Sequence, residues 1–353
     1  MGAFYNGGMY VHLRLHTEFS VVDGTTRIDE VVKAAAADGQ PALAITDLNN
    51  LFGAIKFYKE GRGKGVKPLL GAEIYLETEG GGDPSRMLVL VQNKQGYLNL
   101  SELLARAWTK NVVKNLAVCT WAWLQELSEG LVALSGAQAG PVGQALLKGD
   151  ETRAASLALK LAGIFPHRFY MELQRAGRAD DESHVAAAVQ LAARLQLPVV
   201  ATHPIQFLTA DDYEAHEARV CIAGGEILAN PRRVRRFTRE QYFKSAQQMQ
   251  ELFADVPSAL ANTVEIAKRC SLTLVLGKPQ LPAFPTPNGM PAEEYFRFAS
   301  FEGLEERLKH LYPDEARRDK ERPRYVERLE FELGTILKMG FPGYFLIVGD
   351  FIQ

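Results

Sequence analysis

The sequence predicts an α/β protein with a parallel sheet closed into a barrel, followed by a mainly helical segment. Seven short apolar runs alternate with helical patterns, which is typical of βα units. No glycine-rich dinucleotide-binding turn follows any of these runs, which counts against the competing architecture, an open doubly wound sheet. A proline-rich stretch then separates this part from the helical patterns near the C-terminus.

The first predicted strand, residues 10–15, alternates between two kinds of side chain. Val11, Leu13 and Leu15 point one way and His12, Arg14 and His16 the other, as in a half-buried strand. Its polar face carries two imidazoles and a guanidinium. Strands of a barrel deliver metal ligands from their carboxyl ends, so this strand is a candidate part of a site.

The other predicted elements follow in regular order. The strands are residues 42–46, 69–76, 87–91, 131–134, 168–173 and 198–202. The helices are residues 28–37, a helix capped by Asp47 or Asn49 that runs to about 61, residues 97–108, a helical region up to 165, and residues 183–195. Residues 77–85, with three consecutive glycines, are expected to form a flexible loop.

The proline-rich stretch has five prolines in residues 277–291, which excludes a helix or a central strand. We therefore predict one domain at 1–277, a linker at 278–291 and a second domain at 292–353. Amphipathic helices are predicted at 294–311 and 324–339. Because the chain ends on an apolar run, GFPGYFLIVGDFIQ, we expect a fragment cut inside its second domain.

Composition indicates a cytoplasmic protein. Cys119, Cys221 and Cys270 match no metal or disulfide spacing. The N-terminus lacks the pattern of a signal peptide, and no apolar stretch reaches the roughly 18 residues that span a bilayer. The net charge of −2 gives no bulk attraction for nucleic acid, so any DNA contact needs a local patch.

Several separated motifs in the correct order resemble one family. HTEFSVVDG, ITDLNNLFGAIKFY, LLGAEIYL, QNKQGYLNLSELLARAW, LANTVEIAKRC and GFPGYFLIVGDFIQ are similar to the PHP (polymerase and histidinol phosphatase) domain and following region of bacterial DNA polymerase III alpha subunits. The resemblance covers nearly the whole chain. It implies a distorted seven-stranded (βα) barrel (the PHP fold), and then the truncated start of a polymerase palm.

Active PHP sites use a trinuclear metal cluster, and the resemblance carries their ligands onto this chain position by position. His16, Asp23 and Glu73 keep the family's ligand types. At the other positions the ligand is replaced, and the replacements are Arg14, Leu48, Met87, Ala137, Pro204 and Gln206. A guanidinium offers no lone pair, and three scattered ligands are too few for three ions. We therefore expect a degenerate site, in which Arg14 replaces the lost metal charge by pairing with Asp23 or Glu73.

The resemblance implies an N-terminal part of a replicative DNA polymerase with a non-catalytic barrel. The parent enzyme would use Mg²⁺ held by palm aspartates beyond residue 353, so we expect no catalytic residue and no cofactor here. The implied partners are the proofreading exonuclease subunit, other replicase subunits and primer-template DNA, and no membrane. Two alternatives stay open: a PHP phosphoesterase (3′–5′ exonuclease or pyrophosphatase), with one residual Zn²⁺ or Mn²⁺ on His16, Asp23 and Glu73, and a pure interaction module.

Other candidate residues favour structural roles. His12, His203 and His216 are interpreted as structural histidines: His203 has no co-ligand in Pro204 or Gln206, and His216, with Asp212 and Glu217 nearby, lies on a predicted helix. Ser20 and Ser135 lack the partners of a serine hydrolase. The arginine segment, residues 231–239, carries five arginines in nine residues and could contact phosphates, but pairing with acidic neighbours or solvation is the commoner outcome.

Overall fold

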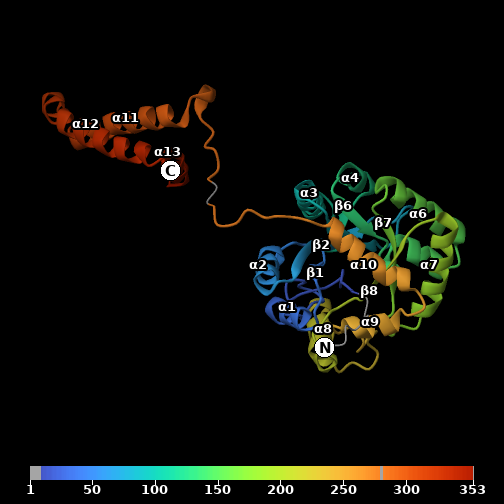
Figure 1. The fold of residues 1–353 in the computed structure, drawn as a ribbon. Coiled ribbons are helices and arrows are strands. Elements are labelled where there is room, and N and C mark those ends of the chain that lie inside the picture. Colours follow the sequence, from blue (N-terminus) through green and yellow to red (C-terminus); the bar gives the residue numbers. More distant parts are fainter. Residues whose placement is uncertain (1–8, 279–280, 353) are drawn as a thin grey trace. The chain divides into compact units, whose positions relative to one another are not determined.

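The computed structural model describes residues 9–278 and 281–352. Three parts lie outside the described residues: 1–8, 279–280 and 353. The first belongs to the N-terminus discussed for the signal-peptide pattern, and the second to the predicted linker. The chain divides into two compact units, 1–273 and 274–353 (Figure 1). The domain limits predicted from the sequence differ slightly from this division, and as functional boundaries they stay a prediction.

Unit 1 contains one mixed sheet. Its strands are β1 (Ala42–Ile45), β2 (Lys67–Leu76), β3 (Ser85–Val91), β4 (Val112–Val113), β5 (Leu116–Cys119), β6 (Leu131–Leu134), β7 (Phe169–Gln174) and β8 (Val199–Thr202). The sheet runs in the order β4-β5-β2-β3-β6-β7-β8, and β1 pairs with the first half of β2. Figure 1 shows helices surrounding these strands.

The N-terminal segment, residues 10–16, closes the barrel. It joins β1 through a bridge between His12 and Leu43, and it joins the residues after β8 through a bridge between Leu15 and Ile205. With β1, β2, β3, β6, β7 and β8 it makes the predicted ring of seven. The segment is not a regular strand. The backbone amide of Leu15 donates to the side-chain Oγ1 of Thr46, where a regular strand would donate to a backbone carbonyl. It is buried on both faces, so the prediction of a half-buried strand was wrong.

The prediction of an all-parallel sheet was also wrong. β3 pairs antiparallel with both β2 and β6. The connection from β2 to β3 is the short glycine-rich loop, which is too short for the crossover that parallel neighbours need. The small β4–β5 hairpin was not predicted, because β4 has only two residues and both are exposed.

The described helices of unit 1 that lie within 28–64, 94–110, 141–164 and 181–195 overlap predicted helical ranges, whereas those at 121–126, 246–252 and 257–269 were not predicted. In full, the described helices of unit 1 are α1 (Ile28–Ala37), α2 (Ala54–Lys64), α3 (Lys94–Lys110), α4 (Trp121–Glu126), α5 (Pro141–Leu147), α6 (Glu151–Ile164), α7 (Asp181–Leu195), α8 (Tyr213–Gly224), α9 (Ala246–Leu252) and α10 (Pro257–Arg269). Neither Asp47 nor Asn49 caps α2. The carboxylate of Asp47 instead accepts hydrogen bonds from the amide and hydroxyl of Thr17. Asn49 has a φ of 54°, in the left-handed region.

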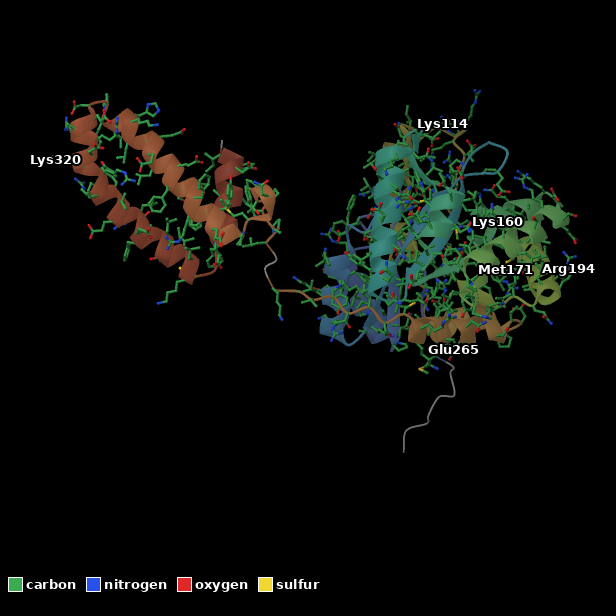
Figure 2. The ribbon with its side chains drawn as sticks, turned by 90° about the horizontal axis from the view of Figure 1, so that it is seen from above. Lys114, Lys160, Met171, Arg194, Glu265 and Lys320 are labelled. Carbon is green, nitrogen blue, oxygen red and sulfur yellow. The ribbon has the colours of Figure 1, made fainter. Side chains whose placement is uncertain are left out.

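One end of the barrel is covered by α10. Its Ile266 and Ala267, and Cys270 directly after it, belong to the main apolar core, together with Leu13 and Val200. Figure 2 shows the labelled Glu265, in α10, and Lys114, in the turn of the β4–β5 hairpin, at opposite ends of unit 1. The carboxyl ends of the parallel strands therefore lie at the end away from α10.

Unit 2 contains the helices α11 (Ala292–Leu311), α12 (Glu315–Lys338) and α13 (Pro342–Ile352). Phe296, Leu333 and Leu346, one from each helix, form its small core. α12 begins earlier than predicted because the side chain of Asp314 accepts from the amide of Arg317. No single helix among the described residues is long and apolar enough to cross a membrane; α12 and α13 pass that test only together, with a bend of 117° between them.

Candidate functional site

Arg14 lies between two buried carboxylates. Its Nη1 donates to Oε1 of Glu73 at 2.7 Å, and its Nε donates to Oε1 of Glu172 at 3.0 Å. Burial lowers the pKa of Arg14, but the charges of Glu172 and Glu73 outweigh this effect and raise it. The pairing with Glu73 is one of the two predicted pairings. The second carboxylate, Glu172 on β7, was not identified from the sequence.

His16 bridges the other two predicted ligands. Its Nδ1 lies 2.9 Å from Oδ1 of Asp23, and its Nε2 lies 2.9 Å from Oε2 of Glu73, although this second contact is not aligned as a hydrogen bond. Burial lowers the pKa of His16, but the charge and hydrogen bond of Asp23, helped by Glu73, raise it to about 9. The imidazole is therefore protonated at neutral pH.

Arg86, at the start of β3, adds a third cation. Its Nη1 lies 3.6 Å from Oδ2 of Asp23 and 3.6 Å from Oε2 of Glu73, and its Nη2 donates to the hydroxyl of Tyr75. Burial raises the pKa of Glu73, but Arg14 and Arg86 hold it well below the ordinary value. The pKa of Asp23 is also lowered, because His16 outweighs the effect of burial.

We call these six residues the ion-pair centre. Its cations are Arg14, His16 and Arg86, and its anions are Asp23, Glu73 and Glu172. The charges balance three against three. Balanced, mutually paired charges are what allow ionised side chains to remain inside a protein.

Asp47 holds the loop that carries Asp23. Its carboxylate accepts from the amide of Thr17 at 2.6 Å and from the Thr17 hydroxyl at 2.9 Å. Burial raises the pKa of Asp47 to about 6 despite these hydrogen bonds. The contacts fix the segment after residue 16 against the carboxyl end of β1.

The remaining predicted positions surround the centre without supplying ligands. Leu48, Met87 and Ala137 are buried apolar side chains. Gln206 reaches the centre, since its Nε2 lies 3.3 Å from Nδ1 of His16. Pro204 contributes only a backbone carbonyl, which accepts from Gln241.

The donors do not fit the metal cluster that the fold family implies. The guanidinium of Arg14 offers no lone pair for an ion, and Arg14 and Arg86 lie against the carboxylates that would bind dications. Within 9–278 and 281–352, no group of three or more His, Cys, Asp and Glu side chains is arranged to hold a metal ion. Within this arrangement, paired arginines neutralise the carboxylates of Asp23, Glu73 and Glu172.

A cavity of about 850 Å³ opens over the ion-pair centre. We call it the mouth cavity. Asp23, Leu48 and Arg86 lie at its inner side, and its walls are mainly apolar. The apolar wall residues include Val21, Val22, Phe52, Trp108, Leu116, Val220, Ala223, Val234 and Phe237. Arg236, from the arginine segment, also lines it.

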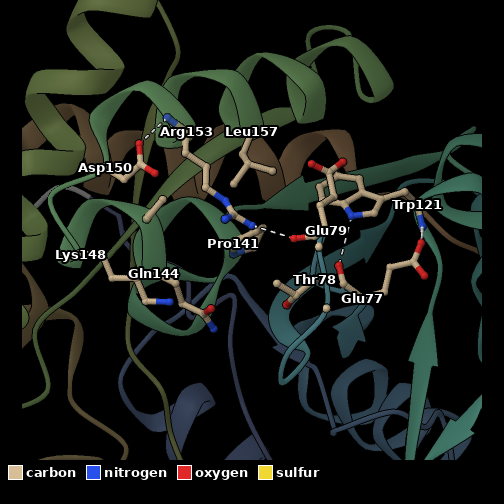
Figure 3. Close-up of a pocket in the computed structure, with 13 residues that line it drawn as sticks. Glu77, Thr78, Glu79, Trp121, Pro141, Gln144, Lys148, Asp150, Arg153 and Leu157 are labelled. Atoms are coloured by element: carbon tan, nitrogen blue, oxygen red, sulfur yellow. Dashed lines mark hydrogen bonds between the residues drawn. The ribbon is translucent and has the colours of Figure 1, made fainter.

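A second, smaller pocket of about 440 Å³ lies between the β2–β3 loop and α5–α6 (Figure 3). Trp121 donates from its amide to Glu77 Oε1, and Arg153 donates to the backbone carbonyl of Glu79. Lys160 also pairs with Glu79. These polar groups are largely paired with one another, and no predicted site residue lines the pocket.

The three histidines with structural interpretations make the expected contacts. Nε2 of His12, His203 and His216 is paired with the backbone carbonyl of Lys244, Glu240 and Asp23 respectively. Burial lowers the pKa of all three, that of His12 to about 4. They are therefore neutral at pH 7 and belong to the packing of unit 1.

Two residues of the centre, Arg86 and Glu172, were missed by sequence reasoning. Each is a single charged residue within or beside an otherwise apolar strand. A buried charge is rare unless it is paired, so a lone charge in a buried strand is a usable signal. That signal does not identify the partner, because the partners lie on strands distant in the sequence.

The comparisons with known proteins agree on one family. The model described as "PHP domain" matches residues 12–176, and that described as "Bacterial DNA polymerase III alpha NTPase domain" matches residues 294–353. The chain is 51% identical over 346 residues to the DNA polymerase III subunit alpha of Pseudomonas aeruginosa and 48% identical over 345 residues to that of Escherichia coli K12. Each match covers 98% of this chain. Nearly the whole chain is thus similar to DNA polymerase III alpha subunits, with a PHP-domain match followed by a match to the bacterial DNA polymerase III alpha model.

This chain spans 30% of the length of those two alpha subunits. Among solved structures, an amidohydrolase from Chromobacterium violaceum is similar, with 14% identity and a TM-score of 0.42. That match covers 60% of this chain and 96% of the amidohydrolase. All six residues of the ion-pair centre lie in the region that the PHP model matches.

Proposed function

We propose that this chain is the N-terminal part of a replicative DNA polymerase alpha subunit, and that its barrel is a non-catalytic scaffold. The whole protein would be a DNA-directed DNA polymerase that uses Mg²⁺ and binds primer-template DNA. One observation carries the proposal for the barrel. Arg14 places a guanidinium between Glu73 and Glu172, at a position where the family pattern has a metal ligand.

The chemistry of the centre supports a scaffold. Metal-dependent phosphoester hydrolysis needs a bound ion that lowers the pKa of water and stabilises charge on the phosphoryl oxygens. In the ion-pair centre the permanent charges of Arg14 and Arg86 take the place of an ion, and neither can bind or ionise a water as a metal does. Such a centre maintains the barrel without hydrolysing a substrate.

The proposed partner is the proofreading exonuclease subunit, as the family resemblance implies. A barrel without its own nuclease activity is compatible with proofreading by a separate subunit that docks on it. The test is size-exclusion chromatography of this 353-residue chain with the purified exonuclease subunit, where we expect co-elution. Failure to co-elute at micromolar concentration would contradict this part of the proposal.

The competing function is a metal-dependent phosphoesterase, favoured by one observation. His16, Asp23 and Glu73 do converge, with His16 touching both carboxylates. Elemental analysis and phosphatase assays with added Zn²⁺ or Mn²⁺ separate the two functions. We expect far less than one ion per chain and no turnover above that of Asp23→Ala. Stoichiometric metal with turnover lost in Asp23→Ala would establish the phosphoesterase.

A further inference from the structure

We propose that the mouth cavity is a docking site for a peptide segment with apolar anchor residues flanked by Asp or Glu. This inference deepens the proposed function, since it assigns the site and the chemistry by which the scaffold would hold a protein partner. It depends on three observations: a preformed apolar cavity, a floor whose carboxylates are paired with Arg14 and Arg86, and an exposed arginine segment that contributes Arg236 to the cavity lining.

The cavity wall is preformed. Trp108 donates from Nε1 to the backbone carbonyl of Asn49 at 2.8 Å, and the side-chain amide of Asn49 donates to the carbonyl of Ala117 at 2.8 Å. The amide of Asn49 in turn donates to the carbonyl of Glu73. A hydrogen-bonded wall does not need to be ordered on binding, so less of the interaction energy is lost.

Large apolar side chains are exposed at the rim. Phe52 is 70% exposed, Val21 is 61% exposed and Val234 is 74% exposed, and all three line the cavity. Ile222 and Ile227, near the end of α8, are also strongly exposed. Contiguous exposed apolar surface around a concave site is typical of a protein interaction site.

The arginine segment supplies charge at the same rim. Arg233 forms a buried ion pair with Glu217, and Arg239 pairs with Glu214, so both ends are tied to α8. Arg232, Arg235 and Arg236 are exposed. No ion pair recorded within the described parts of the chain includes any of these three. Arg236 lines the apolar cavity, and Arg232 and Arg235 are exposed in the same segment, so the positive charge complements a partner that is apolar and acidic.

A nucleic acid fits this site less well. Its phosphates would pair with Arg236, but the aromatic side chains of the lining (Phe52, Tyr75, Trp108 and Phe237) are outnumbered by aliphatic ones, whereas single-stranded nucleic acid is held by successive aromatic stacking along a basic groove. Apolar peptide side chains bury more of this lining than a polyanion does.

The test is a selection of random peptides, displayed on phage, against the immobilised 353-residue chain. We expect enrichment of sequences with Leu, Ile, Phe or Trp next to Asp or Glu. A selected peptide should bind Val234→Glu and Arg235→Glu/Arg236→Glu at least roughly ten-fold more weakly. Matched controls outside the cavity, Leu159→Ser on α6 and Lys33→Glu on α1, should bind like the unmodified chain. Each variant is first checked for an unchanged melting temperature.

Two outcomes would overturn the inference. One is no enrichment of acidic-apolar peptides, or selected peptides that bind the cavity variants as tightly as the controls. The other is displacement of a selected peptide by oligothymidylate with direct binding of that oligonucleotide, which would assign the rim to nucleic acid. Co-elution with the exonuclease subunit is measured separately. If that subunit co-elutes equally with the unmodified chain and with every cavity variant, the scaffold proposal stands and this docking site is wrong. If it does not co-elute even with the unmodified chain while peptides are selected, the site stands with a different partner.

Discussion

Nη1 of Arg14 and Oε1 of Glu73 lie 2.7 Å apart inside the barrel, with side chains that are 6% and 2% exposed. The same guanidinium also contacts Glu172, so a single residue holds two buried carboxylates. Removal of one partner from a buried ion pair leaves an uncompensated charge, which costs more free energy than the pair itself contributes.

Arg14→Ala is therefore expected to lower the free energy of unfolding by about 3–5 kcal/mol, since Glu73 and Glu172 lose their shared cation. Urea denaturation followed by circular dichroism measures the loss. Arg27→Ala, at a residue whose side chain is 63% exposed, is the matched control and should change stability little. An Arg14→Ala variant as stable as the control would show that the guanidinium does not replace the metal charge.

The raised pKa of His16 predicts a pH dependence. Its pKa rises from an ordinary 6.5 to about 9 in the folded chain, so the folded state binds the proton more tightly than the unfolded state. The stabilisation is fully present below pH 6.5 and is lost as pH rises through about 9. We expect the stability difference between the unmodified chain and His16→Asn to shrink over that range. A difference that stays constant from pH 6 to 9.5 would show that His16 is not protonated in the fold.

Metal removal should have no effect on stability. Because paired side chains already neutralise the centre, we expect the melting temperature to be the same with EDTA and with added Zn²⁺ or Mn²⁺. Differential scanning fluorimetry gives the comparison directly. A rise in melting temperature with metal that disappears in Glu73→Gln would reveal a bound ion at the centre.

The ion pair between Arg233 and Glu217 should order the arginine segment. Their side chains are 2% and 0% exposed, so Arg233→Met leaves Glu217 buried without its cation. We expect faster amide hydrogen exchange across residues 226–237 in this variant. Arg232→Met, at a neighbouring exposed position, serves as the control and should exchange at the original rate. Equal exchange in both variants would place the anchor of the segment elsewhere.

The sequence predicted most of the elements, because local periodicity carries them. Residues 28–37 were predicted as a helix and form α1, and apolar runs identified the central strands. The motifs also predicted His16, Asp23, Glu73 and Arg14 as one site, and these four do converge. The start of α2 was placed wrongly. A local capping pattern does not reveal that the carboxylate of Asp47 accepts a hydrogen bond from the amide of Thr17, which lies 30 residues earlier in the chain.

What the sequence by itself determined is the alternation of strands and helices and the family motifs, and the resemblance implied that Arg14 and Leu48 stand at metal-ligand positions. The tertiary structure alone decided the antiparallel pairing of β3, the closure of the barrel by residues 10–16, and the recruitment of Arg86 and Glu172. The physical reason is distance along the chain. Glu172 is 158 residues from Arg14, and a charge is balanced by what the closed barrel brings within hydrogen-bonding distance, which no local pattern records.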